Sequence, residues 1–528
     1  MIALDSPRTT GQRVDRWSLV VFVVVVVLAV PLLLYLGRDQ WFRADDWYVI
    51  GDGADSLDGY FAAHNGHWVT VVTIAHSVSY RLWGLHTYLP YQVPVVLAHV
   101  GSAVLLRILM RQLGVRGWIA TAGALVFVFF GSGSLNIFFG FQISETGSVF
   151  CGLAYFVLAN RDGPIDRRDW LALAVGLVGL MTSAVFVPMV VGVGVAVLIR
   201  RGPRLAAFYT VPLGLVYGVW YLLYGHEDSV MSFSAPGDAL RFVARMLTGT
   251  FTALAGSDVA GIALGLLVLG TLGTISARAL RTRQWTPLAL PAGLIIAWVV
   301  FAGLTALARA SWIGAPDAGR YLHITAALFL PLIALGTEHV ARRNVLVGAL
   351  PILLLTAGLP TNLDRLVNRN PAVVLGSRDA VVWLAHSEYI DDVPPDLEPI
   401  PAGLTGLPVT AGWLSREANA GHIPEPAEPD AAKQLSAYGL LALRQEWIED
   451  VPNCPPAGAN RLALTLADGD RIVFEGDLRI RVRDGQDLSN PLTFQGLFGG
   501  SIGTELGPLD LEIRGVAGKP PRLCEPRP

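Results

Sequence analysis

The chain has 528 residues, of which 53% are hydrophobic and only 15% are charged. A soluble globular protein carries about 25% charged residues, so this composition excludes a chain whose whole surface faces water. The net charge of −3 argues neither for nor against nucleic acid, and no nucleic-acid partner is expected. We therefore predict a mainly α, polytopic membrane protein, in contact with membrane lipids.

The first predicted element is an apolar run from residue 17 to 36, preceded by Arg8, Arg13 and Arg16. About 20 apolar residues cross the hydrocarbon core of a bilayer, so this run is long enough to span it. No small-residue cleavage site follows, which predicts a retained signal anchor rather than a removed signal peptide.

Ten further stretches bring the predicted total to about 11 transmembrane helices. They are 91–110, 118–137, 143–160, 170–183, 185–199, 205–224, 251–276, 286–307, 321–337 and 344–360. The region 170–199 is too long for one ordinary span and has arginines on both flanks. It is therefore predicted to form two short helices that turn near residues 182–184.

Two other stretches are predicted to lie in the membrane interface. In 69–89, polar side chains recur at spacings of three and four, which places them on one helical face: Thr70, Thr73, Ser77 and Arg81. Such an amphipathic helix lies along the interface rather than crossing it. Residues 237–250, with Arg241 and Arg245, are predicted to form a second interfacial helix.

Arginine clusters predict the orientation, because cytoplasmic loops of membrane proteins carry an excess of Lys and Arg. With 11 spans, six clusters fall on the cytoplasmic side: Arg8/Arg13/Arg16, Arg107/Arg111/Arg116, Arg161/Arg167/Arg168, Arg200/Arg201/Arg204, Arg278/Arg281/Arg283 and Arg342/Arg343. A multi-pass cell-membrane protein with a cytoplasmic N-terminus and an extracytoplasmic C-terminal domain is therefore expected.

The tail, 361–528, is predicted to be an extracytoplasmic α+β domain that ends in a β-sheet. Helical patterns cover 378–390 and 430–449, and alternating apolar residues follow. Hairpin turns are expected at Asp468–Gly469 and at Asp484–Gly485.

The cysteines of the tail are expected to form a disulfide. Cys454 and Cys524 both follow the last predicted span and so face an oxidising compartment, where disulfides persist. Cys151 lies in an apolar stretch and is expected to be a packing residue.

The loop 37–68 carries the pair Asp45–Asp46 just beyond the first span. A carboxylate can accept the proton of an attacking hydroxyl, or hold Mg²⁺ or Mn²⁺. The alternative is a solvated loop end, because loops are generally polar.

These motifs have a recognisable order along the chain. Asp-Asp-Trp at 45–47 is followed by His-Asn-Gly-His-Trp at 64–68 and by the run 82–114. The run contains a glycine, an aromatic residue and a histidine, namely Gly84, Tyr88 or Tyr91, and His99. A late span begins with Arg320–Tyr321. Over most of 17–360 this pattern resembles the GT-C superfamily, integral membrane glycosyltransferases that use polyprenyl-phosphate sugars.

The resemblance implies roles for particular residues. Asp46, or else Asp45, would be the catalytic base or a metal ligand, and Glu145 a second acid. Arg320 and Arg309 would bind the donor phosphate, because a guanidinium matches phosphate oxygens. Tyr321 and His323 would assist them. The competing interpretation is that Glu145 makes a local hydrogen bond and that Arg320 reaches the interface to pair with Asp317.

A divalent cation, Mg²⁺ or Mn²⁺, is a further possibility, with Asp46, His64 and His67 as ligands. A histidine pair in a loop more often makes structural hydrogen bonds, and no further ligand follows at a fixed spacing. His99, deep in a span, is expected to be packed and hydrogen-bonded.

The resemblance implies transfer of a sugar from a polyprenyl-phosphate donor to an envelope glycan, lipid or protein acceptor at the outer face. The alternatives are a transporter or flippase for a lipid-linked sugar or polysaccharide, or a non-catalytic scaffold of envelope assembly. The candidate charges gather in the outer loops 37–68, 138–147 and 308–320, and the two halves show no repeat. Since transporters place such groups near the midplane, often within repeats, this distribution favours the enzyme.

Overall fold

The computed structural model describes most of the chain. It leaves out residues 1–9, 52–56, 227–234, 311–315, 369–371, 400–408, 448–455, 458, 468–470, 476–477, 495–499, 505–507, 517–519 and 525–528. The chain divides into two compact units. The helical unit comprises residues 1–38, 56–75 and 91–369, and the mixed unit comprises 39–55, 76–90 and 370–528.

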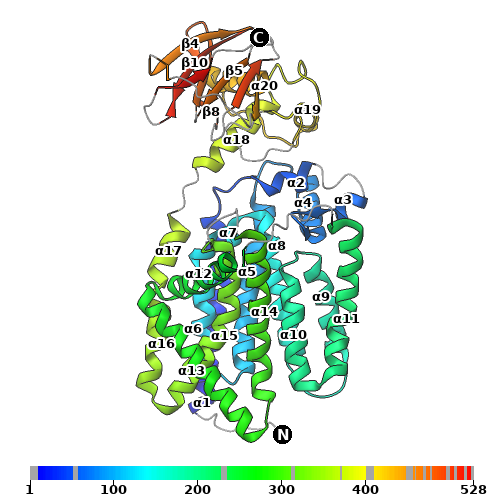
Figure 1. Cartoon of the computed structure of the whole chain (residues 1–528), viewed down its shortest axis with the longest axis vertical. Helices are drawn as coiled ribbons and strands as arrows, with labels where there is room; N and C mark the ends of the chain where they lie inside the picture. Colours follow the sequence, from blue (N-terminus) through cyan, green and yellow to red (C-terminus); the bar gives the residue numbers. More distant parts are fainter. Residues whose placement is uncertain are drawn as a thin grey trace, which may run out of the picture. The chain divides into compact units, whose positions relative to one another are not determined.

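Long helices dominate the helical unit (Figure 1). They are α1 (Thr10–Leu36), α5 (Leu89–Gln112), α6 (Gly117–Val128), α8 (Ile143–Ala159), α9 (Arg167–Leu180), α10 (Phe186–Arg201), α11 (Pro203–Trp220), α12 (Pro236–Ala255), α13 (Asp258–Thr282), α14 (Thr286–Arg309), α15 (Gly319–Arg343) and α16 (Val345–Ala357). Short elements join them: α3 (Leu57–Phe61), β1 (Ala63–His64), β2 (His67–Trp68), α7 (Ser134–Phe138) and α17 (Leu359–Val367). Helix α4 (Thr70–Trp83) begins in this unit, and α2 (Asp45–Gly51) belongs to the mixed unit.

Among the described residues, nine helical segments are long and apolar enough to cross a membrane. They are Asp15–Leu36, Leu89–Gln112, Gly117–Phe138, Gly140–Ala159, Pro203–Gly225, Asp258–Thr282, Thr286–Arg309, Gly319–Arg343 and Val345–Val367. Helices α9 and α10, with 14 and 16 residues, are the two short helices predicted around residues 182–184. The prediction of a mainly α, polytopic membrane protein is confirmed.

Close packing inside the helical unit depends on glycine where α10 meets α14. A Cβ atom at Gly192 would lie 2.4 Å from the carbonyl oxygen of Gly293, and one at Gly293 would lie 2.6 Å from that of Gly192. Because lipid is as apolar as the helix surfaces, such small residues let the backbones approach and gain contact that lipid cannot replace.

The predicted interfacial helix at 237–250 corresponds to α12, which runs across the ends of the long helices in Figure 1. Gly256 ends α12 in a left-handed conformation, with φ +77°, and the Ser257 side chain caps α13. The crossing predicted at 251–276 therefore begins later, at Asp258.

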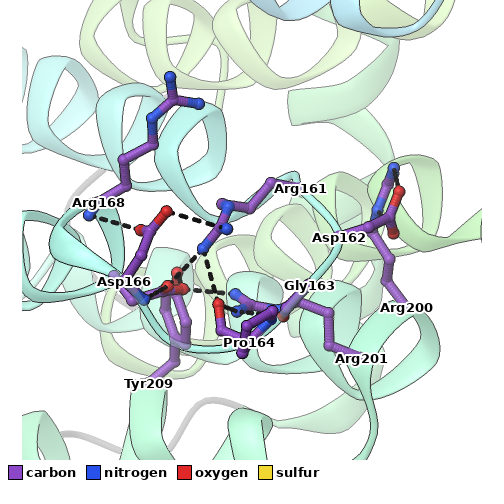
Figure 2. A network of polar contacts seen from close by, with 10 residues as sticks. Arg161, Asp162, Gly163, Pro164, Asp166, Arg168, Arg200, Arg201 and Tyr209 are labelled. Carbon is purple, nitrogen blue, oxygen red and sulfur yellow. Dashed lines mark hydrogen bonds and ion pairs between the residues drawn. The ribbon is translucent and has the colours of Figure 1, made fainter.

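A buried carboxylate at the start of α9 joins this helix to α10 and α11; Figure 2 labels its partners Arg161, Arg201 and Tyr209. Asp169 is fully buried and accepts hydrogen bonds from Arg161 Nη1 at 2.6 Å, from Arg201 Nη1 and from the Tyr209 hydroxyl. The backbone N–H of Asp166 donates a further bond at 2.8 Å. Burying a charge is costly unless it is paired and hydrogen-bonded, and this carboxylate has both kinds of partner. The network fixes the loop between α8 and α9.

Within the tail, the mixed unit contains three described helices and two antiparallel sheets. The helices are α18 (Ala372–Ala385), α19 (Ala411–Asn419) and α20 (Ala431–Ala442). One sheet has the order β4-β10-β6-β7, with β8 also on β6, and the other has the order β11-β5-β9-β3. The strands are β3 (Leu443–Trp447), β4 (Arg461–Leu466), β5 (Arg471–Glu475), β6 (Leu478–Asp484), β7 (Asp487–Leu488), β8 (Leu492–Phe494), β9 (Gly500–Thr504), β10 (Leu509–Gly515) and β11 (Arg522–Cys524). The α+β character predicted for the tail is confirmed.

The five-stranded sheet shows why the apolar alternation in the tail predicted strands. Ile480, Val482 and Ile513 are buried, and α20 packs on this face, where a Cβ atom at Gly439 would lie 2.7 Å from Val482. Successive side chains of a strand point to opposite faces, so one face of β6 is apolar and the other carries arginines.

One predicted hairpin of the tail differs from the structure, and some predicted features of the tail fall outside the described residues. The hairpin expected at Asp468–Gly469 is wrong in its pairing, because β4 pairs with β10 whereas β5 pairs with β9 and β11. Alternation reveals which face of a strand is buried but not its partner. The turn residues 468–470 themselves, and Cys454, lie outside the described residues, so the disulfide to Cys524 stays a prediction.

The hairpin expected at Asp484–Gly485 is confirmed. Asp484 pairs with Asp487 across a tight turn, and Gly485 has φ +55°. The boundary between the units falls near residue 370 rather than 361, because Asn362 in α17 hydrogen-bonds Ser132 and so belongs to the helical unit.

Replacing Asp169 by Ala should destabilise the protein by about 3–5 kcal/mol, because Arg201 would remain buried without its counter-charge. Thermal unfolding of the purified protein in detergent measures this loss. The matched control is Asp162→Ala in the same loop, because Asp162 is largely exposed where it pairs with Arg200. Equal melting temperatures for the two variants would contradict the structural role of Asp169.

Candidate functional site

The acidic pair lies at the start of α2, and Asp46 is fully buried. The Tyr88 hydroxyl donates to Asp46 Oδ2 at 2.8 Å, and His76 Nε2 lies 3.1 Å from Oδ1. The backbone N–H of Arg43 reaches Oδ2 at 3.2 Å. Both carboxylate oxygens are therefore occupied, as burial of a charged group requires.

An aromatic cluster surrounds this carboxylate. The rings of Trp41, Phe42, Trp47 and Tyr88 contact one another, with centroids 5.0–5.8 Å apart. The indole N–H of Trp41 also donates to the carbonyl of Leu85 at 3.3 Å. These contacts hold α2 and the segment before α5 in one arrangement, so the Tyr88 hydroxyl has a fixed position.

Asp45, the neighbour of Asp46, is only partly buried. A general base must come within about 3 Å of the proton that it removes. Asp45 is the more accessible carboxylate, and Asp46 anchors the helix that carries it. The resemblance put Asp46 before Asp45 as the catalytic residue, whereas the side chain of Asp45 is the more exposed of the two.

Glu145 and Arg320 come together through a buried asparagine. The Asn136 side chain donates to Glu145 Oε2 at 3.1 Å and to the backbone carbonyl of Arg320 at 3.3 Å. The Thr146 hydroxyl holds the Asn136 backbone at 2.6 Å. Asn136, on α7, is a functional candidate that the sequence reasoning missed, and its one signal was an amide in the apolar run 134–141.

The guanidinium of Arg320 lies beside Tyr321. Arg320 Nη2 donates to the Tyr321 hydroxyl at 2.9 Å, and its central carbon lies 4.8 Å from the centre of that ring. Arg320 is partly exposed and Tyr321 is buried, so the tyrosine orients an arginine that can still reach a ligand. Arg309 is also partly exposed, at the end of α14.

His323 contacts His99 rather than the Arg320 guanidinium among the described contacts. It is fully buried in α15, and its Nε2 lies 3.0 Å from His99 Nδ1. His99 Nε2 lies 3.0 Å from the Val128 carbonyl, which can only accept, so Nε2 is the donor in this contact. The His323 ring is therefore buried against His99 inside the helical unit, and its role beside Arg320 stays a prediction.

The histidines proposed as metal ligands have other partners. His67 Nδ1 lies 2.9 Å from the Ser183 hydroxyl, and His64 contacts Asn65 and the Phe141 ring. In the part of the chain that the structure describes, no group of three or more His, Cys, Asp or Glu side chains could hold a metal ion. Asp46 is held by Tyr88 and His76, and the metal role of Asp46, His64 and His67 stays a prediction.

An apolar cavity of about 600 Å³ lies among α12, α13, α14 and α15. Its lining includes Phe251, Gly265, Trp298 and Phe329. The rim includes Ile262 and Leu269, which are more than 60% exposed and so form part of the lipid-facing surface. The indole N–H of Trp298 is buried, and no hydrogen-bond partner for it occurs among the described residues.

These features define a polytopic membrane protein with an anchored acidic helix and an apolar cavity. No family model and no curated protein matches the chain. Among solved structures, the chain is similar to the crystal structure of ArnT from Cupriavidus metallidurans bound to undecaprenyl phosphate. The identity is 14% and the TM-score 0.45, over 81% of this chain and 92% of that one. A likeness this weak carries no argument about function, which rests on the residues of the site.

The anchoring role of Asp46 predicts unequal effects of the two aspartates on stability. Asp46→Ala should destabilise the protein by about 1–3 kcal/mol, because the buried Tyr88 and His76 lose their acceptor. Asp45→Ala should change stability less than Asp46→Ala, because the Asp45 side chain is only partly buried. Thermal unfolding of both variants tests this, and an equal loss in both would remove Asp46 as the anchor.

Proposed function

We propose that the protein is a membrane glycosyltransferase that moves a sugar from a polyprenyl-phosphate donor to an envelope glycan, lipid or protein acceptor. The main observation behind the proposal is that contacts of Asp46 hold α2 in a fixed position. This helix carries Asp45 a few residues after the first span. The arginine clusters of the sequence support an outer position for this loop. Sugar nucleotides are cytosolic, so an outer site favours a lipid-linked donor.

In the proposed reaction, Asp45 accepts the proton of an acceptor hydroxyl. The hydroxyl oxygen forms a bond to the anomeric carbon as the bond from that carbon to the phosphate oxygen breaks. The bonding electrons leave with polyprenyl phosphate, and the configuration of the sugar inverts. A positioned base contributes about 10²–10⁴-fold to the rate of such a step.

The leaving phosphate gains negative charge, and Arg320 is the residue that we assign to it. A guanidinium offers two parallel donors to phosphate oxygens, and Tyr321 already orients it. Asn136 and Glu145 hold the backbone at this point, so the start of α15 is fixed before a ligand arrives. Arg309 supplies a second positive charge.

The prenyl chain of the donor is assigned to the cavity among α12–α15. The cavity is lined mainly by apolar side chains, with Asp258 and two threonines also present, and it opens on the exposed surface of α13, as an isoprenoid chain entering from the bilayer needs. Each buried methylene of such a chain contributes about 0.8 kcal/mol. The proposal routes no step through a metal ion, although a requirement for Mg²⁺ or Mn²⁺ stays open to direct test.

One observation favours the transporter or flippase alternative. The hydrogen-bonded pair His99–His323 lies buried inside the helical unit, and ionisable residues within spans often mark ion or proton pathways. The scaffold alternative has no such support. Transfer assays separate these possibilities.

Wild-type protein in nanodiscs should transfer sugar from a polyprenyl-phosphate donor to a membrane extract. Asp45→Asn should lower kcat by about 10²–10⁴-fold, since Asn keeps the shape of Asp but loses its basicity. Arg320→Ala should raise the donor KM, and Arg320→Lys should restore it poorly, because lysine lacks the planar fork.

A fully active Asp45→Asn variant would exclude the proposed base. If wild type transfers no sugar from any donor but moves a fluorescent lipid-linked sugar between leaflets, the flippase alternative replaces the enzyme.

The assignment of the cavity predicts a selective effect of filling it. Gly265 lines the cavity, and a Cβ atom there would meet nothing within 4 Å. Gly265→Leu should therefore fold normally but raise the donor KM by about tenfold, which corresponds to 1.4 kcal/mol of lost binding. Gly270→Leu, on the same helix and equally unobstructed, lies outside the cavity and is the matched control. Equal KM values for the two variants would refute this assignment.

A further inference from the structure

The end of α4 is joined to the C-terminal domain by a partly buried acid, Glu417. The Tyr80 hydroxyl donates to Glu417 Oε2 at 2.6 Å, and His422 Nδ1 lies 2.7 Å from the same oxygen. The Tyr80 ring also stacks on Trp413, with centroids 6.1 Å apart and planes inclined by 28°. All four residues belong to the mixed unit, although Tyr80 is more than 300 residues away from the others in sequence.

The backbone after α4 is held by the same part of the tail. The N–H of Leu85 donates to the carbonyl of His422 at 2.7 Å, and His86 Nε2 lies 2.9 Å from the carbonyl of Gly421. Gly84 has φ +55°, and a Cβ atom there would lie 2.4 Å from the carbonyl oxygen of His422. Glycine is therefore required at this point for two reasons, its backbone conformation and the closeness of the tail.

Glu417 stays ionised under ordinary conditions. Burial by itself would raise its pKa, but the hydrogen bonds from Tyr80 and His422 outweigh that effect and lower the pKa below its usual value. A charged acceptor makes hydrogen bonds about twice as strong as a neutral one. The contact between α4 and α19 therefore has a strong polar centre.

The segment held in this way leads directly to the acidic pair. Leu85 accepts the indole N–H of Trp41, and Tyr88 donates its hydroxyl to Asp46. An unbroken series of contacts thus runs from Glu417 through residues 80–88 to the helix that presents Asp45. We propose that Tyr80, Glu417 and His422 are positioning residues, through which the C-terminal domain sets the place of α2.

The positioning of α2 does not depend on the proposed function. Only the expected effect of the positioning residues on activity rests on it. A carboxylate that takes a proton must lie within hydrogen-bonding reach of it, and a misplacement of about 1 Å can cost 10²-fold in rate. The tail therefore acts on the reaction without touching the substrate. Its loss should affect the chemical step, kcat, more than binding of the lipid donor.

Hydrogen exchange followed by mass spectrometry, on the full chain in nanodiscs, tests the positioning directly. Tyr80→Phe keeps the ring on Trp413 and removes only the hydroxyl, and Glu417→Gln removes the charge. Both variants should raise exchange in residues 41–51 by about threefold or more, because local opening becomes easier. Exchange in α20 should not change. Asp379→Asn, which breaks the exposed ion pair with Lys433 in the same unit, is the matched control and should leave 41–51 unchanged.

The same variants are then assayed for transfer. Both should lower kcat by about tenfold with the donor KM within about twofold of wild type. The double variant should lose no more than either single one, because both remove the same link.

Unchanged exchange in 41–51, or a rise throughout α20 as well, would overturn the positioning role whatever the activity. If exchange rises in 41–51 alone but wild type itself transfers no sugar, the proposed function fails and the positioning of α2 stands.

Discussion

The arrangement around the acidic loop depends on one constraint, the burial of the Asp46 carboxylate. A charged group removed from water is stable only when its oxygens are hydrogen-bonded, and Asp46 obtains these bonds from His76, Tyr88 and the backbone of Arg43. These donors come from α4, from the segment between α4 and α5, and from the loop before α2. Satisfying one buried charge therefore fixes three pieces of chain at once, and the accessible Asp45 takes its place from them.

The same physical rule acts at Asp169 with a different result. There the donors are Arg161, Arg201 and Tyr209, and the buried charge joins helix ends rather than presenting a neighbour. Between such polar anchors the helices meet through small residues, as at Gly192 and Gly293, because apolar side chains gain nothing by leaving lipid for protein. Polar contacts thus supply the specificity that the hydrophobic effect cannot supply inside a membrane.

The proposed enzyme combines three features that have separate physical origins. An accessible acid stands on an anchored helix, an arginine is oriented by a tyrosine, and an apolar cavity opens toward lipid. A transporter would need its polar groups within the span, where the structure offers the pair His99–His323. The involvement of the C-terminal domain gives the tail a part in the enzyme that its sequence alone did not suggest.

The sequence by itself determined the membrane class, the two short helices around residues 182–184 and the hairpin at Asp484–Gly485. These are local properties, since a span or a tight turn is encoded in adjacent residues. It could not determine that β4 pairs with β10, because strand partners are chosen over distances that no local pattern records. Nor could it show that Asp46 is the buried member of the acidic pair, or that His323 contacts His99. The burial of a side chain such as Asp46 or His323 depends on which face of its helix meets partners such as Tyr88 or His99. These partners are distant in sequence, so only the tertiary structure brings them together.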